Sequence, residues 1–156
     1  MGATTTPLIS LLPKLKEDYP SFQFTEGEHF LWSPENQTVF FTPDGDPTLL
    51  LHELGHALLK HADYERDVQL LTMERAAWEK AFELGELYGV TVPVDTAEDH
   101  LDTYRDWLHA RSTCPTCTAT GFQSASTQYT CPACSQVWAV NEARLCQLRR
   151  VRTGLA

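Results

Sequence analysis

The sequence predicts an α+β protein in two parts, a first domain over residues 1–111 and a second over residues 112–156. Three observations lead to this prediction. Short aromatic and β-branched segments lie between residues 22 and 41, long segments with helical apolar spacing follow them, and two Cys-x-x-Cys pairs lie toward the C-terminal end. A chain of 156 residues with 42% hydrophobic content can bury one modest core and a small appendage.

The first domain is expected to begin with a helix and a small sheet. Residues 8–19 have the apolar spacing of a helix, which Pro13 either kinks or splits. Three short segments have the composition of strands: residues 22–24, 30–32 and 38–41. The run Ser33-Pro34-Glu35-Asn36 is typical of a turn between the last two, so we expect a small antiparallel sheet.

Three helices are expected after the sheet. The first covers residues 47–61, with Asp46 as its N-cap. The second covers residues 67–88 and ends before Gly89, which is typical of a helix C-terminus. The third covers residues 96–110 and begins with a sequence that resembles a capping box.

The first of these helices contains the motif His52-Glu53-Leu54-Gly55-His56. Histidines four residues apart lie on one face of a helix, so His52 and His56 can bind the same zinc ion. The glutamate between them can take a proton from a zinc-bound water, which predicts Glu53 as the catalytic residue. The alternative is an ordinary apolar helix with two satisfied histidines. We favour the metal, because polar side chains in an apolar helix are costly to bury without a partner.

A catalytic zinc usually has three protein ligands and one open position, so a third ligand is required. We favour Glu74, which lies 18 residues after His56 within an apolar stripe of the second helix. The small side chains of Ala77 and Ala81 in the same stripe would let that helix approach the first one closely. The alternative for Glu74 is a surface glutamate paired with a neighbouring basic side chain.

Three other residues are alternatives for the third ligand. His61 is the nearest histidine after the motif. Asp63 and Asp67 fall in the expected turn between the two helices, where solvent exposure is the ordinary outcome.

The second domain is defined by two cysteine pairs: Cys114, Cys117, Cys131 and Cys134. Four thiolates close a tetrahedral zinc site with no open position, so we expect this zinc to hold structure rather than perform chemistry. A redox or iron–sulfur function is the alternative. Thr118 and Ser135 follow the second cysteine of each pair, where zinc ribbons often carry glycine. A short helix over residues 141–152, which includes Cys146, is expected to end the chain.

The run His52-Glu53-Leu54-Gly55-His56-Ala57-Leu58-Leu59-Lys60-His61, with Met73-Glu74-Arg75-Ala76-Ala77-Trp78-Glu79-Lys80-Ala81 after it, resembles the ImmA/IrrE family of small zinc metallopeptidases. The resemblance covers about residues 5–110. It implies a minimal gluzincin, a zincin-like fold in which a helix, a small sheet, the HExxH helix and a glutamate-bearing helix form the domain.

The resemblance also implies the roles of single residues. It assigns His52, His56 and Glu74 as ligands of the catalytic zinc and Glu53 as the general base. The family often has Glu-x-Glu-Ala in the second helix, whereas this chain has Ala76 at the second glutamate. The third-ligand role therefore falls on Glu74.

We expect from this resemblance a zinc-dependent endopeptidase that cuts a protein substrate, with transcriptional repressors and other DNA-binding regulators as candidate substrates. The segment over residues 38–41 is either the edge strand that binds an extended substrate or an ordinary core strand. One alternative is a SprT-type protease acting on DNA-associated protein, which also joins an HExxH helix to a zinc ribbon but uses a histidine as third ligand. Another is a non-catalytic regulatory protein whose zinc sites only shape a binding surface.

Charge is unevenly distributed along the chain. Residues 1–110 carry 7 Lys/Arg against 20 Asp/Glu, whereas residues 111–156 carry 5 Arg against Glu142 alone. The basic second part gives weak support to nucleic-acid binding by the ribbon, and docking of a protein is at least as well supported. The N-terminus has no basic segment before a long apolar stretch, and no run approaches transmembrane length, so we expect a cytoplasmic protein that does not associate with membranes.

Overall fold

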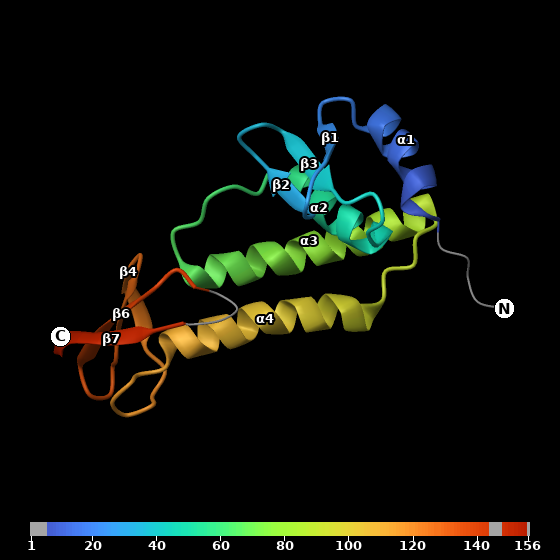
Figure 1. Ribbon diagram of the computed structural model, residues 1–156. Coiled ribbons are helices and arrows are strands. Elements are labelled where there is room, and N and C mark those ends of the chain that lie inside the picture. Colours follow the sequence, from blue (N-terminus) through green and yellow to red (C-terminus); the bar gives the residue numbers. More distant parts are fainter. Residues whose placement is uncertain (1–5, 144–147, 156) are drawn as a thin grey trace. The chain divides into compact units, whose positions relative to one another are not determined.

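The computed structural model describes residues 6–143 and 148–155, which form four helices and seven strands (Figure 1). The helices are α1 (Leu8–Asp18), α2 (Pro47–Leu58), α3 (Asp67–Tyr88) and α4 (Val94–Ser112). The strands are β1 (Gln23–Glu26), β2 (Leu31–Ser33), β3 (Thr38–Phe41), β4 (Phe122–Ala125), β5 (Gln128–Thr130), β6 (Gln136–Val140) and β7 (Arg150–Leu155). The α+β prediction is confirmed.

The chain divides into two compact units. Unit 1 comprises Met1–Asp63 and Thr72–Ala97, and unit 2 comprises Tyr64–Leu71 and Glu98–Ala156. Compactness does not establish independent folding, so the domain boundary after residue 111 stays a prediction.

The sheet of unit 1 is mixed, so the prediction of an antiparallel sheet was wrong. Its strand order is β1-β3-β2, with β2 antiparallel and β1 parallel to β3. The predicted turn between β2 and β3 forms the hairpin, whereas β1 pairs on the far side of β3. This parallel pairing aligns Phe24 with Val39, and both side chains are buried. The pairing therefore completes the apolar face of the sheet.

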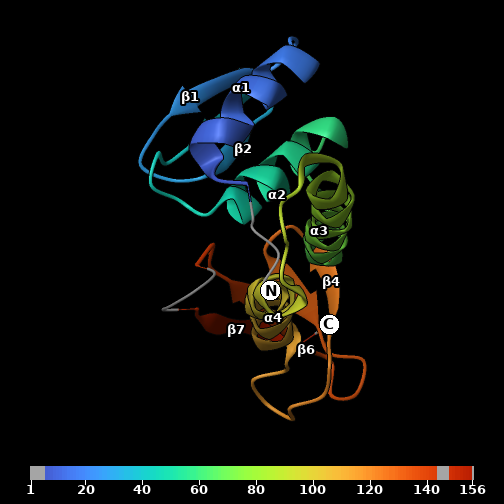
Figure 2. The ribbon, with the colours of Figure 1, turned by 90° about the vertical axis from the view of Figure 1, so that its right-hand side faces the viewer.

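Helix α2 is the centre of unit 1. It packs against β2 and β3 on one side and approaches α3 on the other (Figures 1 and 2). The buried side chains of α2 are Thr48, Leu50, Leu51, His52, Leu54, His56 and Ala57. A helix covered on two sides needs apolar residues around most of its circumference, which explains the Leu-rich sequence of this segment.

The helix predictions hold to different extents. Helix α1 is continuous through Pro13, whose ring is exposed. Helix α3 has the predicted bounds, and the C-cap prediction for Gly89 is confirmed by its φ of 70°. Helix α2 ends at Leu58, earlier than predicted, and α4 extends from Val94 to Ser112, beyond both predicted ends.

Unit 2 contains the four-stranded antiparallel sheet β4-β5-β6-β7. Its core consists of Cys114, Tyr129, Cys131, Trp138 and Val140. The predicted helix over residues 141–152 was wrong at its end, because β7 begins at Arg150 and pairs with β6. Residues 144–147, including Cys146, lie outside the described part of the chain.

The described residues contain no helix that combines the length and the apolar composition needed to span a membrane.

Candidate metal centres

The first centre is built on α2. Asp46 caps this helix, because its carboxylate accepts a hydrogen bond of 2.8 Å from the backbone N–H of Thr48, and Pro47 occupies the first helical position. Both features fix where the helix begins and therefore which residues share a face. His52 and His56 lie one turn apart on that face, and both side chains are buried.

Three ligand atoms meet between α2 and the part of α3 in unit 1. The Nε2 atoms of His52 and His56 are 3.2 Å apart, and Oε2 of Glu74 lies 3.0 Å from the first and 3.3 Å from the second. Around a tetrahedral zinc with bonds of 2.0–2.1 Å, two ligand atoms are separated by about 3.3–3.4 Å. The three side chains therefore fit a metal ion, and they are positioned to bind one.

Glu74 is 5% exposed, so it is not the surface glutamate that was the alternative for this position. Close approach of the helices brings it to the histidines. A Cβ atom at Gly55 of α2 would lie 2.6 Å from the carbonyl oxygen of Ala77 in α3, closer than Cβ atoms ordinarily come. Only glycine at position 55 allows this separation, which places Glu74 within reach of both imidazoles.

The electrostatics of the centre favour the protonation states that a metal requires. Burial lowers the pKa of His52, although the neighbouring Glu74 opposes this effect. Burial alone would raise the pKa of Glu74, but hydrogen bonds to His52 and His56 outweigh it and hold that pKa well below its ordinary value. A neutral imidazole and an ionised carboxylate are the metal-binding forms.

Trp78 supports the first centre, and this role was not predicted from the sequence. Its ring stacks on the imidazole of His52, with centroids 4.2 Å apart and an interplanar angle of 22°. Trp78 lies one helical turn after Glu74, so it extends the same side of α3. That spacing was the available signal.

Glu53 faces the sheet as well as the histidines. Its Oε2 accepts a hydrogen bond of 2.8 Å from the backbone N–H of Trp32 in β2, and its carboxylate lies within 4.8 Å of metal-binding atoms of His52 and His56. The carboxylate is thus held beside the three-atom cluster by a backbone donor.

Strand β2 is an edge of the sheet, whereas β3 is central, so residues 38–41 form the core strand and not an edge.

The three alternative ligands lie elsewhere. His61 contacts the opposite nitrogen of His56, with the two Nδ1 atoms 2.8 Å apart. Asp63 is exposed. Asp67 is 3% exposed, so the expectation of solvent exposure was wrong, and it accepts hydrogen bonds from Arg111 and Tyr129 in unit 2.

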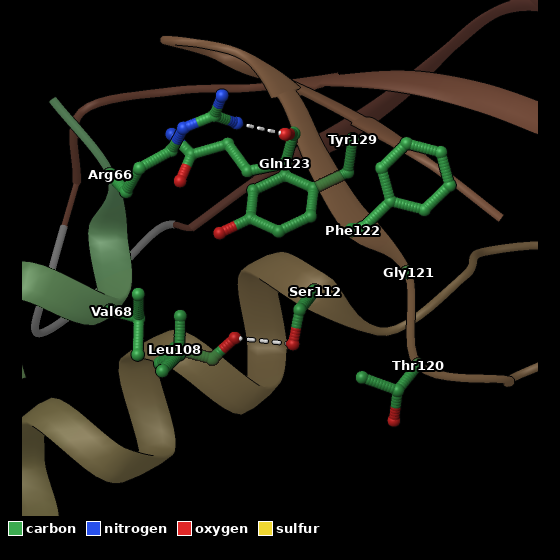
Figure 3. Close-up of a pocket in the computed structure, with 9 residues that line it drawn as sticks. All are labelled: Arg66, Val68, Leu108, Ser112, Thr120, Gly121, Phe122, Gln123 and Tyr129. Atoms are coloured by element: carbon green, nitrogen blue, oxygen red, sulfur yellow. Dashed lines mark hydrogen bonds between the residues drawn. The ribbon is translucent and has the colours of Figure 1, made fainter.

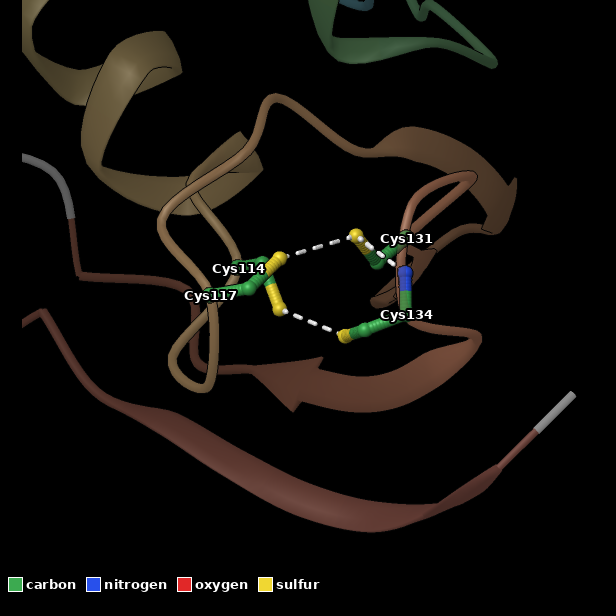
Figure 4. A group of neighbouring side chains, drawn as sticks. All are labelled: Cys114, Cys117, Cys131 and Cys134. Carbon is green, nitrogen blue, oxygen red and sulfur yellow. Dashed lines mark hydrogen bonds between the residues drawn. The ribbon is translucent and has the colours of Figure 1, made fainter.

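The second centre consists of the four cysteines of unit 2, whose sulfur atoms converge (Figure 4). The Sγ atoms of Cys114 and Cys134 are 3.6 Å apart, and those of Cys117 and Cys131 are 3.5 Å apart. A zinc ion with bonds of 2.3 Å separates its sulfur ligands by about 3.8 Å. The cluster is therefore positioned to bind a metal ion, and a zinc ribbon is compatible with it.

Two tight backbone turns form this cluster. In each, the residue after the second cysteine donates its N–H to the carbonyl oxygen of the first, at 3.0 Å for both Thr118 and Ser135. Both residues have left-handed φ angles, 66° and 63° respectively. These are the positions where glycine is common in ribbons, and the turns form here without it, at a cost in conformational strain.

Backbone groups also point at the sulfur atoms. The N–H groups of Thr116 and Ala133 each lie 3.4 Å from the first sulfur of their own turn. Although burial raises the pKa of Cys114, the backbone donors of Cys117 and Thr116 outweigh it and lower that pKa. These donors therefore favour the thiolate of Cys114, which is the metal-binding form.

A buried polar network in unit 2 was not predicted. Arg111 Nε donates to Asp67 Oδ2 at 2.7 Å, and the Tyr129 hydroxyl donates to the same oxygen at 2.5 Å. The backbone N–H of Asp67 donates to Gln123 Oε1 at 2.7 Å. Because Tyr129 lies two residues before Cys131, the network ties the first turn of α3 to the cysteine cluster.

An adjacent cavity of about 370 Å³ is lined by apolar side chains, including Val68, Leu108 and Phe122, together with polar ones (Figure 3). Arg66 lies at its edge and donates a hydrogen bond to the carbonyl oxygen of Gln123.

Comparisons of the chain with protein-family models, with curated proteins and with solved structures found no match. Any functional conclusion therefore rests on the residues and their geometry.

Proposed function

We propose that this protein is a zinc-dependent endopeptidase of the ImmA/IrrE type, with a zincin-like first part and a zinc ribbon as its second part. One observation carries the proposal. Two histidine nitrogens and one carboxylate oxygen lie 3.0–3.3 Å from one another, with the Glu53 carboxylate beside them. Two histidines and a glutamate as ligands with a second glutamate as base define a gluzincin site.

In this proposal His52, His56 and Glu74 hold the zinc ion. When bound, the ion supplies Lewis acidity, which lowers the pKa of a water molecule and polarises the carbonyl group under attack. Glu53 then acts as general base, takes the proton of the attacking water and delivers it to the departing amine. The hydrogen bond from the Trp32 N–H holds the Glu53 carboxylate beside the ligand atoms of His52 and His56.

Strand β2 is the candidate for substrate binding in place of β3. As an edge strand it can pair with an extended peptide through backbone hydrogen bonds. Trp32 of β2 already contacts Glu53, so a peptide along this edge would pass close to the general base. A protein substrate with an extended segment is therefore proposed, and a DNA-binding regulator remains the candidate class.

Four thiolates held for a metal need a reducing compartment, and we accordingly propose a cytoplasmic location. The second cluster would hold structure only, because four cysteine ligands leave no open position. The arginines of β7 give weak support to direct nucleic-acid binding by this part of the chain.

The SprT-type alternative requires a histidine as third ligand. His61, the histidine nearest in sequence, lies against Nδ1 of His56 rather than beside the two Nε2 atoms, which favours Glu74 as ligand. The non-catalytic alternative differs only in its chemistry, because it needs the metals but no general base.

The test is cleavage of a peptide library by the zinc-loaded full chain, read by mass spectrometry as new peptide termini. The proposal expects cleavage by the wild type and none by Glu53→Gln, which retains its zinc because only the proton acceptor is removed. Glu35→Gln makes the same change at an exposed turn and should cleave as the wild type does. Equal cleavage by Glu53→Gln, or no cleavage by fully loaded wild type, would favour the binding protein.

A further inference from the structure

The end of α2 has a specific backbone geometry that determines where His61 lies. Lys60 has a left-handed φ of 57° and donates its N–H to Ala57 at 3.1 Å, while the His61 N–H bonds back to the carbonyl oxygen of His56 at 3.0 Å. This pair of bonds is a Schellman motif, in which two particular side chains commonly contact each other. In this chain those side chains belong to His56 and His61. The usual apolar contact is replaced by one between two imidazoles.

A second contact fixes His61 from the sheet. The indole Nε1 of Trp32 donates a hydrogen bond of 2.8 Å to the carbonyl oxygen of His61. The backbone of His61 is therefore bonded to α2 through its N–H and to β2 through its carbonyl. Its ring reaches His56 from a fixed position, with the ring centroids 5.0 Å apart.

The two nitrogens of His56 have different surroundings. Nε2 lies 3.2 Å from Nε2 of His52 and 3.3 Å from Oε2 of Glu74, whereas Nδ1 lies 2.8 Å from Nδ1 of His61. A nitrogen that binds a metal presents its lone pair, so the ring proton of neutral His56 sits on Nδ1. Within the described part of the chain that proton faces His61, whose Nδ1 then acts as the acceptor.

We propose that His61 is a positioning residue of the first metal centre, which accepts the Nδ1–H of His56 and holds the ring with Nε2 toward the other two ligands. A hydrogen-bond acceptor behind a ligating histidine fixes its tautomer and its orientation and makes the ligand more basic. A carboxylate or a carbonyl oxygen usually takes this role. Here a third histidine takes it. The inference rests on the proposed function of this centre as a zinc site.

The experiment compares two substitutions with opposite properties. His61→Asn keeps an acceptor, because the amide oxygen of asparagine can occupy the place of the imidazole Nδ1, but it loses volume. His61→Leu keeps volume and loses the acceptor. His29→Leu makes the same change at an exposed histidine of unit 1 and serves as the control.

The measurement is the zinc dissociation constant of the first centre in the full chain, by competition with a chelator, while the four-cysteine cluster stays loaded. His61→Leu should bind zinc about 10–100-fold more weakly than the wild type. His61→Asn should stay within a few-fold of the wild type, and His29→Leu should equal it. A role in packing alone predicts the reverse order of the two His61 variants and would overturn the proposal.

The same titration separates this inference from the proposed function. Wild type that binds two zinc ions, with affinity unchanged in His61→Leu, would overturn only the role of His61. Wild type that binds zinc at the cysteines alone would overturn both.

Discussion

Gly55 of α2 faces the carbonyl oxygen of Ala77 in α3 so closely that a methyl group on Gly55 would lie 2.6 Å from that oxygen. The oxygen belongs to the helix backbone and cannot rotate away as a side chain would. The separation of the two helices, and with it the distance from Glu74 to the histidines, therefore depends on the absence of a side chain at position 55.

Gly55→Ala should destabilise the protein by about 1–3 kcal/mol, because the helices must move apart or strain. The sign of this change in stability is informative, because alanine inside a helix is otherwise about 1 kcal/mol more favourable than glycine. Thermal denaturation of the full chain measures the effect, and zinc affinity at the first centre should fall with it. A variant that is more stable than the wild type would show that the two helices are not in this contact.

The helices and the HExxH side chains could be predicted because their signals are local. Apolar spacing, the Asp46 cap and the Gly89 stop lie within or next to the segments they define. The burial of Glu74 could be predicted from its stripe of α3, where Ala77 and Ala81 are also fully buried.

Other features depend on residues far apart in the sequence. Strand β1 pairs parallel to β3, although β2 lies between them in the sequence. No local pattern of residues 23–26 specifies that partner. Asp67 and Arg111 are 44 residues apart, and each looks like an ordinary surface charge in its own segment. The end of the chain was predicted as a helix, but pairing with the edge of β6 overrides local propensity in β7.

The role of His61 was hidden for a different reason. The Schellman motif is usually signalled by glycine at the left-handed position, and this chain has Lys60 there. The sequence therefore showed a histidine close after the motif, but it did not show that the backbone at Lys60 brings His61 to His56.

The burial of His52 predicts how stability depends on pH when a chelator has emptied the first centre. The pKa of His52 in the folded state is lowered from 6.5, so the unfolded state takes up this proton first as the pH falls. Stability that is fully present above 6.5 should be lost below it, with a slope of up to about 1.4 kcal/mol per pH unit from this proton.

Denaturant unfolding between pH 7.5 and pH 5.5 measures this slope. His52→Gln removes the titrating group, so its stability should decline less steeply than that of the wild type over the same interval. The effect of acid on the cysteine cluster is common to both chains and cancels in the difference. Equal slopes would mean that His52 is not held neutral by burial.

The left-handed residues of the cysteine turns predict a stabilising substitution. Ser135→Gly should raise the stability of the zinc-loaded protein by about 0.5–1 kcal/mol, because glycine adopts a φ of 63° without the steric cost of a Cβ atom. Ser126→Gly is the matched control, since Ser126 is not among the residues with positive φ. Thermal denaturation should separate the two, and a loss of stability in Ser135→Gly would contradict the strain at this turn.

The two centres should differ in how readily they release metal. A chelator should strip the first centre before the second, because three protein ligands leave a position open whereas four cysteines close the coordination sphere. Zinc release followed over time with a colorimetric chelator should show two phases of equal amplitude. Loss of the fast phase in Glu74→Ala, with the slow phase unchanged, would assign the fast phase to the first centre, and a single phase in the wild type would count against two different sites.

Zinc content of the purified full chain is the most direct measurement of whether His52, His56 and Glu74 form a metal centre. Elemental analysis should give two zinc ions per wild-type chain and one per Glu74→Ala chain, whereas His61→Ala should retain two at saturating zinc with weakened affinity at the first centre. Wild type with a single zinc ion would contradict the account. So would Glu74→Ala that retains both ions while His61→Ala loses one, because the third ligand would then be a histidine.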